Sequence, residues 1–293
     1  MLRAVTAPLT DQAIALFHEQ GYLVVDFAFD EQLLEQIIAK VQPFYPLQWQ
    51  QKPTSPTRVM DAWKLVDEAR QLAVQDQVLS ALQQLFGRQA LPFQTLNFPF
   101  GTCQAPHSDT IHFNSIPGNM MAGVWVALED IDENNGPLLY YPGSHKRAEL
   151  TMQDFALRPT ADDYPKYEQC MHKLVKEEKL RKEYGLIKKG HAIIWHANLI
   201  HGGEGHWDAT RSRHSQVTHY YFADCQYFTP MLSTAEHKHF RNPKWIPASF
   251  DQEIAEQAAE EYGRRRDKER AQMAAQGPAT FFNRVTSRLF KSS

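Results

Sequence analysis

The segment GHAIIWHANLIHGG, residues 190–203, gives the first indication of the fold. Its apolar run HAIIWHA has the β-branched and aromatic residues of a buried strand, and a histidine and two glycines follow. Similar short runs, GVWVALED, GPLLYY and HSQVTHYYFA, recur between about residues 92 and 225, separated by turn signals such as ENNGP and YPGS. Many short strands with frequent turns predict a mainly β fold, either a barrel or a jelly roll.

Helices are expected to flank this β region. Residues 10–20 and 30–41 have the apolar spacing of amphipathic helices, and Asp30 is a suitable N-cap for the second. Residues 76–86 predict a further helix that ends at Gly87.

The composition indicates a globular protein with a substantial core. The chain has 293 residues, of which 43% are hydrophobic and 12% aromatic, and its net charge of −3 provides no broad field for nucleic acid. The three cysteines, Cys103, Cys170 and Cys225, are too few and too widely spaced to indicate a disulfide framework or a cysteine-based zinc site. The sequence contains neither the apolar core of a secretory signal nor a membrane span, so we expect a cytoplasmic protein.

The β pattern is interrupted at residues 152–189 by a charged, helix-like stretch that we interpret as a lid-like insertion. Its basic residues alternate with glutamates, and they are Lys166, Lys173, Lys176, Lys179, Arg181, Lys182, Lys188 and Lys189. Two interpretations remain open. These residues form a solvated helix face, or they recognise an anionic or carrier-linked substrate.

We expect a catalytic domain over residues 1–250 and a helical C-terminal extension over residues 251–293. Near the end of this extension Phe281, Val285 and Leu289 fall on one helix face, with basic residues elsewhere. Such a helix docks onto the domain or a partner subunit, which would make the protein an oligomer, or it contacts a membrane surface weakly.

The segment PHSDTIHFN, residues 106–114, contains a candidate metal motif. In an extended segment alternate side chains point the same way, so His107 and Asp109 could reach one ion. A second histidine from elsewhere would complete the two-histidine, one-carboxylate set that binds Fe(II) and leaves other positions open. His-x-Asp is common, however, and does not establish a metal site by itself.

Further residues downstream supply what this site lacks. His201 precedes Gly202 and Gly203, where a backbone without side chains could pass close to the ligands. Arg213 and Ser215 then lie two residues apart on a predicted strand and face one pocket. A keto acid such as 2-oxoglutarate that chelates iron needs a partner for its far carboxylate, and arginine provides a planar fork for it.

Other histidines nearby compete for the role of the third ligand. His196 lies in the middle of its strand, where the inward or outward direction is undecided, and His191, His206 and His214 fit polar strand or loop positions. His219 either faces away or lines the substrate pocket. Near the ligands, His112 and His145 remain candidates for contacts to a ligand or to substrate.

With these motifs in order, the chain resembles the phytanoyl-CoA dioxygenase family of Fe(II)/2-oxoglutarate oxygenases over roughly residues 10–225. The set His107-x-Asp109, His201 and Arg213-x-Ser215 carries the resemblance, together with ENNGPLLYYPGSHK at 133–146 and FHEQGYLVV at 17–25. It implies a double-stranded β-helix core, of the cupin-like jelly-roll type. It also implies that the two histidines and the aspartate bind iron and that Arg213 and Ser215 bind the far carboxylate.

The resemblance extends to two further residues and to the reaction. Trp125 would lie beside 2-oxoglutarate, although a tryptophan in a barrel strand is often simply core, and Gln94 would contact the cosubstrate unless it is a surface or core-capping residue. The implied reaction uses O2 to hydroxylate a C–H bond of a small molecule and releases succinate and CO2. A retained Asp109 favours hydroxylation over halogenation, because related halogenating enzymes lack this carboxylate.

Other functions remain as alternatives. The same iron chemistry can give desaturation or cyclisation. A metal-dependent cupin-type isomerase or lyase would have no use for the arginine clamp, and a non-catalytic binding protein would not need the intact ligand set. A nucleic-acid demethylase should show a basic groove with interleaved aromatic residues. The sequence shows no convincing groove of this kind before the C-terminal extension.

Overall fold

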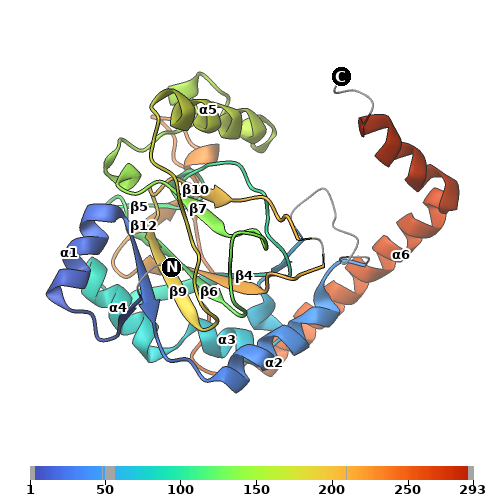
Figure 1. Cartoon of the computed structure of the whole chain (residues 1–293), viewed down its shortest axis with the longest axis horizontal. Coiled ribbons are helices and arrows are strands. Elements are labelled where there is room, and N and C mark those ends of the chain that lie inside the picture. The colour runs from blue at the N-terminus through green and yellow to red at the C-terminus, as the bar shows by residue number, and fades with distance from the viewer. Residues whose placement is uncertain (1–3, 48, 50–56, 209, 290–293) are drawn as a thin grey trace.

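The computed structural model describes residues 4–47, 49, 57–208 and 210–289, with side chains as far as residue 274 (Figure 1). The helices are α1 (Asp11–Gln20), α2 (Glu31–Val41), α3 (Asp67–Ala73), α4 (Asp76–Phe86), α5 (Tyr164–Glu177) and α6 (Gln252–Leu289). The strands are β1 (Val5–Thr6), β2 (Tyr22–Asp26), β3 (Val59–Met60), β4 (Ala90–Phe98), β5 (Asn114–Ile116), β6 (Met121–Ala127), β7 (Leu138–Tyr140), β8 (Glu183–Tyr184), β9 (His191–His196), β10 (His201–Gly203), β11 (Ser215–Phe222), β12 (Gln226–Phe228) and β13 (Phe240–Arg241).

Three sheets form the core of the domain. The major sheet has seven strands in the order β1-β2-β9-β6-β11-β4-β3, and its central pairs are antiparallel. Two smaller sheets have the orders β10-β7-β8 and β13-β12-β5. Neighbours in the major sheet are distant in sequence, as in a jelly roll, so the predicted mainly β fold with flanking helices is confirmed.

Alternation along the central strands divides the apolar residues between two cores. In β6, Val124 and Val126 face the helices that cover one side of the major sheet, whereas Trp125 and Ala127 face the space between this sheet and β7. The period of two is the expected result of side chains pointing to opposite faces. Helices α1 to α4 lie together on the outer side of the sheet (Figure 1). The inner face of the major sheet is not covered by these four helices and can therefore hold a site.

The helix ends follow the sequence signals. The Asp30 side chain accepts a hydrogen bond from the Gln32 amide at the start of α2. Helix α4 ends at Gly87, which has the left-handed conformation that glycine adopts without strain. The predicted helices over residues 10–20, 30–41 and 76–86 are confirmed within one residue.

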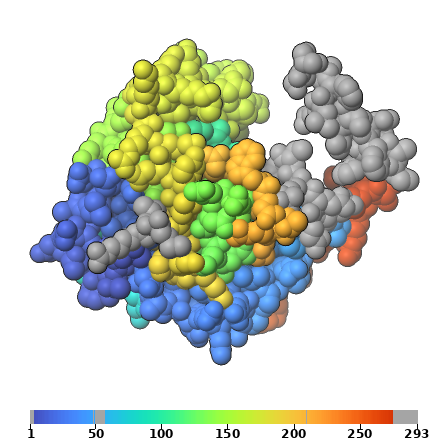
Figure 2. Space-filling view, viewed as in Figure 1, coloured from blue at the N-terminus to red at the C-terminus, as the bar shows by residue number. Residues whose placement is uncertain are grey.

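The insertion at residues 152–189 is part of the domain's packing. Its helix α5 buries Tyr167, Met171 and Val175 against Ile111 and Leu139 in one apolar cluster. In Figure 2 this segment, in yellow-green, covers one end of the molecule. The short strand β8 then pairs with β7. The segment is therefore held by the buried face of α5 and by the pairing of β8 with β7.

The C-terminal helix α6 packs beside the turn that follows α2. The Tyr262 hydroxyl and the Arg266 guanidinium both donate to the Pro43 carbonyl, and the Tyr262 ring meets Phe44 edge-on. The side chains of Phe281, Val285 and Leu289 lie outside the described residues, so docking, oligomer formation and weak membrane contact through this face stay predictions. Among the described helices, none combines the length and the apolarity needed to cross a membrane.

Backbone hydrogen bonds join the loop after β4 to strand β10. His107 and His201 form an isolated antiparallel bridge, in which each amide donates to the other's carbonyl at 2.9 Å. The two chains approach closely because Gly202 and Gly203 have no side chains. A Cβ atom on Gly202 would lie 2.6 Å from the Gln104 carbonyl oxygen, and one on Gly203 would lie 2.5 Å from Thr102 Oγ1.

Replacing Gly202 by alanine is therefore expected to destabilise the fold. The added methyl group meets backbone rather than a movable side chain, so we expect the free energy of unfolding to fall by about 1–3 kcal/mol. Denaturant unfolding of the metal-free protein measures this change.

Gly263→Ala on α6 is the matched control, because a Cβ atom there meets nothing within 4 Å. It should leave stability unchanged or raise it slightly. Equal effects of the two substitutions would show that the close approach at Gly202 is unimportant.

Candidate active site

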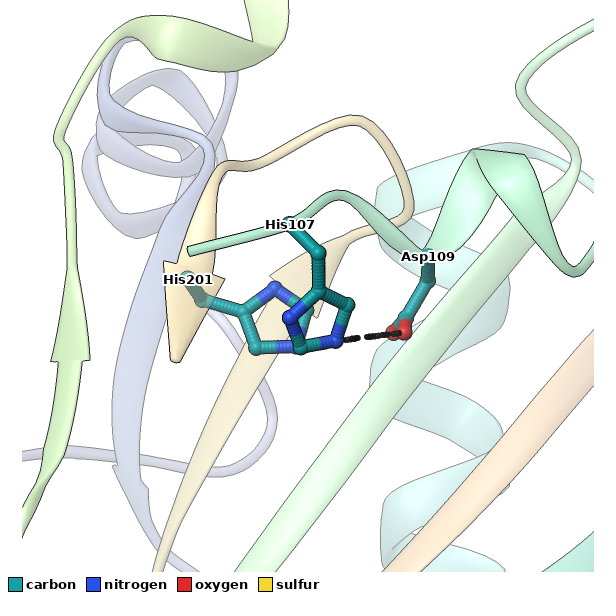
Figure 3. A group of neighbouring side chains, drawn as sticks. All are labelled: His107, Asp109 and His201. Carbon is teal, nitrogen blue, oxygen red and sulfur yellow. Dashed lines mark ion pairs between the residues drawn. The ribbon is translucent and has the colours of Figure 1, made fainter. Parts of the chain in front are cut away.

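The structure brings three of the predicted residues into one buried cluster. The ligand atoms of His107, Asp109 and His201 lie within 4.8 Å of one another, and the three side chains are buried. The Nε2 atoms of both histidines are each 3.8 Å from Asp109 Oδ1. Figure 3 shows the two rings side by side next to the Asp109 carboxylate.

Hydrogen bonds fix the orientation of both imidazoles. His107 Nδ1 lies 2.9 Å from the Ala105 carbonyl oxygen, and His201 Nδ1 lies 3.0 Å from that of Leu199. A carbonyl only accepts, so each Nδ1 carries the hydrogen and each Nε2 presents a lone pair to the cluster. Metal-ligating histidines are held in the same way.

The electrostatics of the cluster also suit a cation. Burial is the main reason that the pKa of His107 falls to about 3, with the neighbouring His201 as a second cause, so this ring stays neutral near pH 7. Burial alone would raise the pKa of Asp109, but the surrounding histidines and a hydrogen bond from Trp195 lower it to about 2. Two imidazoles and one carboxylate are the donor set typical of non-haem Fe(II).

Trp195, on β9, holds the carboxylate, although no sequence motif marks this residue. Its indole nitrogen donates to Asp109 Oδ2 at 2.8 Å, which leaves Oδ1 for the cluster, and its ring lies 4.9 Å from that of His201. The ring fits because β6 has Gly123 opposite it, where a Cβ atom would lie 2.3 Å from the indole. Strand pairing, which no local pattern reveals, creates this contact.

The cluster lines a cavity of about 700 Å³ between the sheets. Its apolar walls include Leu96, Phe98, Trp125, Leu138 and Val217. Such a cavity, with a few convergent polar groups, has the character of a small-molecule site.

Arg213 also lines this cavity and is 3% exposed. Its Nη1 donates to Ser215 Oγ at 3.1 Å and its Nη2 to the Phe100 carbonyl at 2.9 Å. Its Nε is buried without a hydrogen-bond partner among the described residues. Burial lowers the pKa of the guanidinium to about 10, which still leaves it charged. A buried cation with an unused donor fits an anionic ligand.

The other predicted cosubstrate residues lie in different positions. Trp125 lines the cavity and packs against Arg213, whose guanidinium carbon is 5.4 Å from the ring centroid. Ser215 is fully buried and touches Arg213, but it is not among the residues that line the cavity in the described part of the chain. Gln94 lines the cavity farther along β4, where its Oε1 accepts from His219 Nδ1 at 2.9 Å.

His219 faces the cavity as well, on the same side of β11 as Ser215 and Val217. Since its Nδ1 donates to Gln94, its Nε2 is an acceptor, and this atom lies 3.8 Å from Asp109 Oδ2. Burial chiefly lowers the pKa of His219 to about 4, so the ring is neutral near pH 7. The structure thus decides between the two predicted directions of His219, and alternation along β11 from Arg213 agrees with it.

The remaining histidines lie apart from the cluster or at its edge. His196 stacks on Phe86, which packs among the helices, and its Nδ1 accepts from the Asn198 amide. His145 Nε2 donates to the His18 carbonyl, away from the cavity. His112 lines the cavity, and its ring lies 4.7 Å from that of Tyr164.

Comparison with known families decides the relationship. The model of the phytanoyl-CoA dioxygenase family matches residues 17–215, more than half of the chain. The chain belongs to the phytanoyl-CoA dioxygenase family. Human peroxisomal phytanoyl-CoA dioxygenase is 32% identical over 126 residues, which are 41% of this chain and 34% of the human protein. A zebrafish (Danio rerio) phytanoyl-CoA dioxygenase domain-containing protein 1 is 30% identical over 114 residues, 39% of this chain and 38% of its own. The matched region thus spans about a third of the length of these curated relatives.

Solved structures confirm the jelly-roll fold of this phytanoyl-CoA dioxygenase family member. The non-haem alpha-ketoglutarate-dependent carbocyclase SnoK from nogalamycin biosynthesis superimposes with a TM-score of 0.60 at 19% identity, covering 77% of this chain and 89% of its own. EctD from S. alaskensis, solved with 2-oxoglutarate and 5-hydroxyectoine, gives a TM-score of 0.59 at 18% identity, covering 83% of this chain and 87% of its own.

Trp195→Phe should weaken divalent metal binding by about 10- to 100-fold, because loss of a hydrogen bond to a ligating carboxylate typically costs this much affinity. Titration of the metal-free protein with Mn(II), followed by the electron paramagnetic resonance of the free ion, measures the change. Trp207→Phe is the control, since its side chain is 73% exposed. Unchanged Mn(II) affinity in Trp195→Phe would contradict the positioning role.

Proposed function

We propose that this protein is an Fe(II)- and 2-oxoglutarate-dependent dioxygenase that hydroxylates a C–H bond of a small-molecule metabolite and releases succinate and CO2. One observation carries the proposal. A buried guanidinium with an unused Nε shares a cavity with a two-histidine, one-carboxylate cluster. A cupin-type isomerase or a binding protein needs no such arginine.

The cluster is proposed to hold the metal through His107 Nε2, His201 Nε2 and Asp109 Oδ1. The Ala105 and Leu199 carbonyls keep both rings in the binding tautomer, and Trp195 keeps the second carboxylate oxygen occupied. When bound, iron with 2-oxoglutarate supplies the O2 activation that couples oxidative decarboxylation to C–H oxidation. The protein's part is to hold the donors rigidly and to position the reactants beside them.

Arg213 is proposed to bind the far carboxylate of 2-oxoglutarate. Its Nε and a guanidinium nitrogen can donate side by side, as in bidentate arginine–carboxylate pairs. Ser215 supports this position by accepting from Nη1, and Trp125 forms a dry wall beside the guanidinium. Gln94 acts through His219, whose ring it orients.

Hydroxylation is favoured because Asp109 keeps its carboxylate, which excludes a halide from that position. The carbocyclase SnoK has a similar fold, so this fold is also compatible with ring formation. Desaturation or cyclisation would require no different cluster, because the outcome depends on how substrate lies beside it. Product analysis by mass spectrometry separates a gain of one oxygen from a loss of two hydrogens.

Residues 1–250 are proposed to form the catalytic unit, with the helix after residue 251 as an extension. A cytoplasmic location is proposed as well. The three cysteines are free thiols, which suits a reducing compartment that keeps iron ferrous.

The test is an anaerobic absorbance titration of the metal-free protein with Fe(II) and 2-oxoglutarate. A weak visible charge-transfer band should appear in the wild type. Arg213→Ala should raise the 2-oxoglutarate concentration needed for the band at least about tenfold, because it removes charge-assisted hydrogen bonds. Asp109→Ala should weaken iron binding itself.

Arg211→Ala is the matched control, since this neighbouring arginine pairs with Asp132 and does not line the cavity within the described chain. It should behave as the wild type. A folded, iron-loaded wild type without a band would exclude the proposed activity, and an unchanged 2-oxoglutarate requirement in Arg213→Ala would exclude the proposed clamp.

A further inference from the structure

Two arginines that the proposed chemistry does not use line the same cavity. Arg58 precedes β3, which is the edge strand of the major sheet. Arg241 is the last residue of β13, in the small sheet with the order β13-β12-β5. They therefore reach the cavity from different elements, and neither belongs to the proposed cosubstrate site around Arg213.

Arg241 is held in a fixed position. Its Nη1 donates to the His112 carbonyl at 3.3 Å and to Thr229 Oγ1 at 3.2 Å, and its guanidinium lies 4.8 Å from the centre of the Phe113 ring. These contacts involve one nitrogen and one face of the group. The side chain is half-buried, so its other nitrogens stay accessible from the cavity.

Neither arginine forms an ion pair in the described part of the chain. Among the residues that line the cavity there, Asp109 is the one acidic side chain, and the proposed metal would neutralise it. The cavity thus holds two guanidinium charges for which the described chain provides no ion-pair partner.

The lysines of the insertion do not offer a comparable site. Lys166, Lys182 and Lys188 pair with Asp163, Glu204 and Asp130. In the described chain Tyr164 is the insertion residue that lines the cavity, and none of the insertion's basic residues does. The structure therefore favours a solvated face for these basic residues, whereas Arg58 and Arg241 line the cavity.

We propose that Arg58 and Arg241 bind an anionic group of the substrate, a carboxylate or a phosphate, in the cavity that holds the metal cluster. This inference rests on the proposed function, because it names the substrate class of that site. Arginine suits both anions, since its planar fork matches carboxylate and phosphate oxygens. The substrate's remaining part would lie against apolar walls such as Met231, Leu232 and Phe240.

The contacts between Arg241 and the cluster place the anion away from the oxidised carbon. The Phe113 ring packs on Arg241 and lies 5.1 Å from the His219 ring, whose Nε2 is 3.8 Å from Asp109. The rings of Phe113 and His219 thus lie between the Arg241 guanidinium and the Asp109 carboxylate. A substrate anchored at Arg241 would present to the metal a carbon several bonds from its charge, and His219 Nε2 would accept a hydrogen bond from any donor on that carbon chain.

The experiment uses the full chain with Mn(II), a redox-silent substitute for iron, and saturating 2-oxoglutarate, which occupies Arg213. Calorimetry measures binding of 4-phenylbutanoate and 4-phenylbutyl phosphate against neutral 4-phenylbutanamide. The wild type should bind at least one anion about tenfold or more tightly than the amide, and the better of the two identifies the group. Arg58→Gln combined with Arg241→Gln should reduce this preference to about twofold or less.

Two further variants control for charge and for folding. Arg264→Gln with Arg265→Gln removes two exposed arginines of α6 outside the cavity and should keep the full preference. Arg241→Lys keeps the positive charge and should retain part of the preference for anions over the amide. Equal binding of amide and anions by the wild type, or an unchanged preference in the Arg58/Arg241 variant, would overturn the inference.

The same samples separate this inference from the proposed function. Displacement of 2-oxoglutarate is followed independently, and the Arg58/Arg241 variant should bind it as the wild type does. If 2-oxoglutarate does not bind but the anion preference depends on the two arginines, the proposed function fails and the anion site stands. If 2-oxoglutarate binding were lost in the Arg58/Arg241 variant, these arginines would belong to the cosubstrate site instead.

Discussion

The bridge between His107 and His201 is the contact on which the site depends. Two backbone hydrogen bonds join segments 94 positions apart in the sequence, and the two imidazoles leave the bridge on the same side. Asp109 follows two residues later and joins them because the major sheet presents Trp195 to its outer oxygen. The paired glycines after His201 permit the close approach, so local sterics, rather than any attraction between the side chains, set the spacing of the donors.

The charges of the cavity have a consistent pattern around this cluster. Arg213 is buried with incomplete hydrogen bonding, an arrangement that costs free energy and that an anionic cosubstrate would relieve. Arg241 and Arg58 also line the cavity, and neither forms an ion pair in the described part of the chain. A metal ion, a dicarboxylate and an anionic substrate together would satisfy groups that the protein alone leaves unpaired, so the charges of the cavity itself contribute to its binding specificity.

Short sequence patterns predicted the parts of the structure that depend on interactions between residues close in sequence. Caps and apolar spacing placed α1, α2 and α4, and the glycines after His201 distinguished it from His196, whose strand position decides nothing alone. Trp195, Arg58 and Arg241 were missed because strand pairings across the sheets bring them to the cavity, and no short pattern encodes these pairings. The direction of the His219 side chain could be predicted from alternation along β11. The position of Gln94 beside His219 instead follows from the register of β4 with β11.

The most direct test of the account is a crystal structure of the protein grown anaerobically with Fe(II) and 2-oxoglutarate, with data collected at the iron absorption edge. The account predicts one strong anomalous peak bound by His107 Nε2, His201 Nε2 and Asp109 Oδ1, with the far carboxylate of 2-oxoglutarate on the Arg213 guanidinium. An iron peak at other side chains, or 2-oxoglutarate bound away from Arg213, would contradict it.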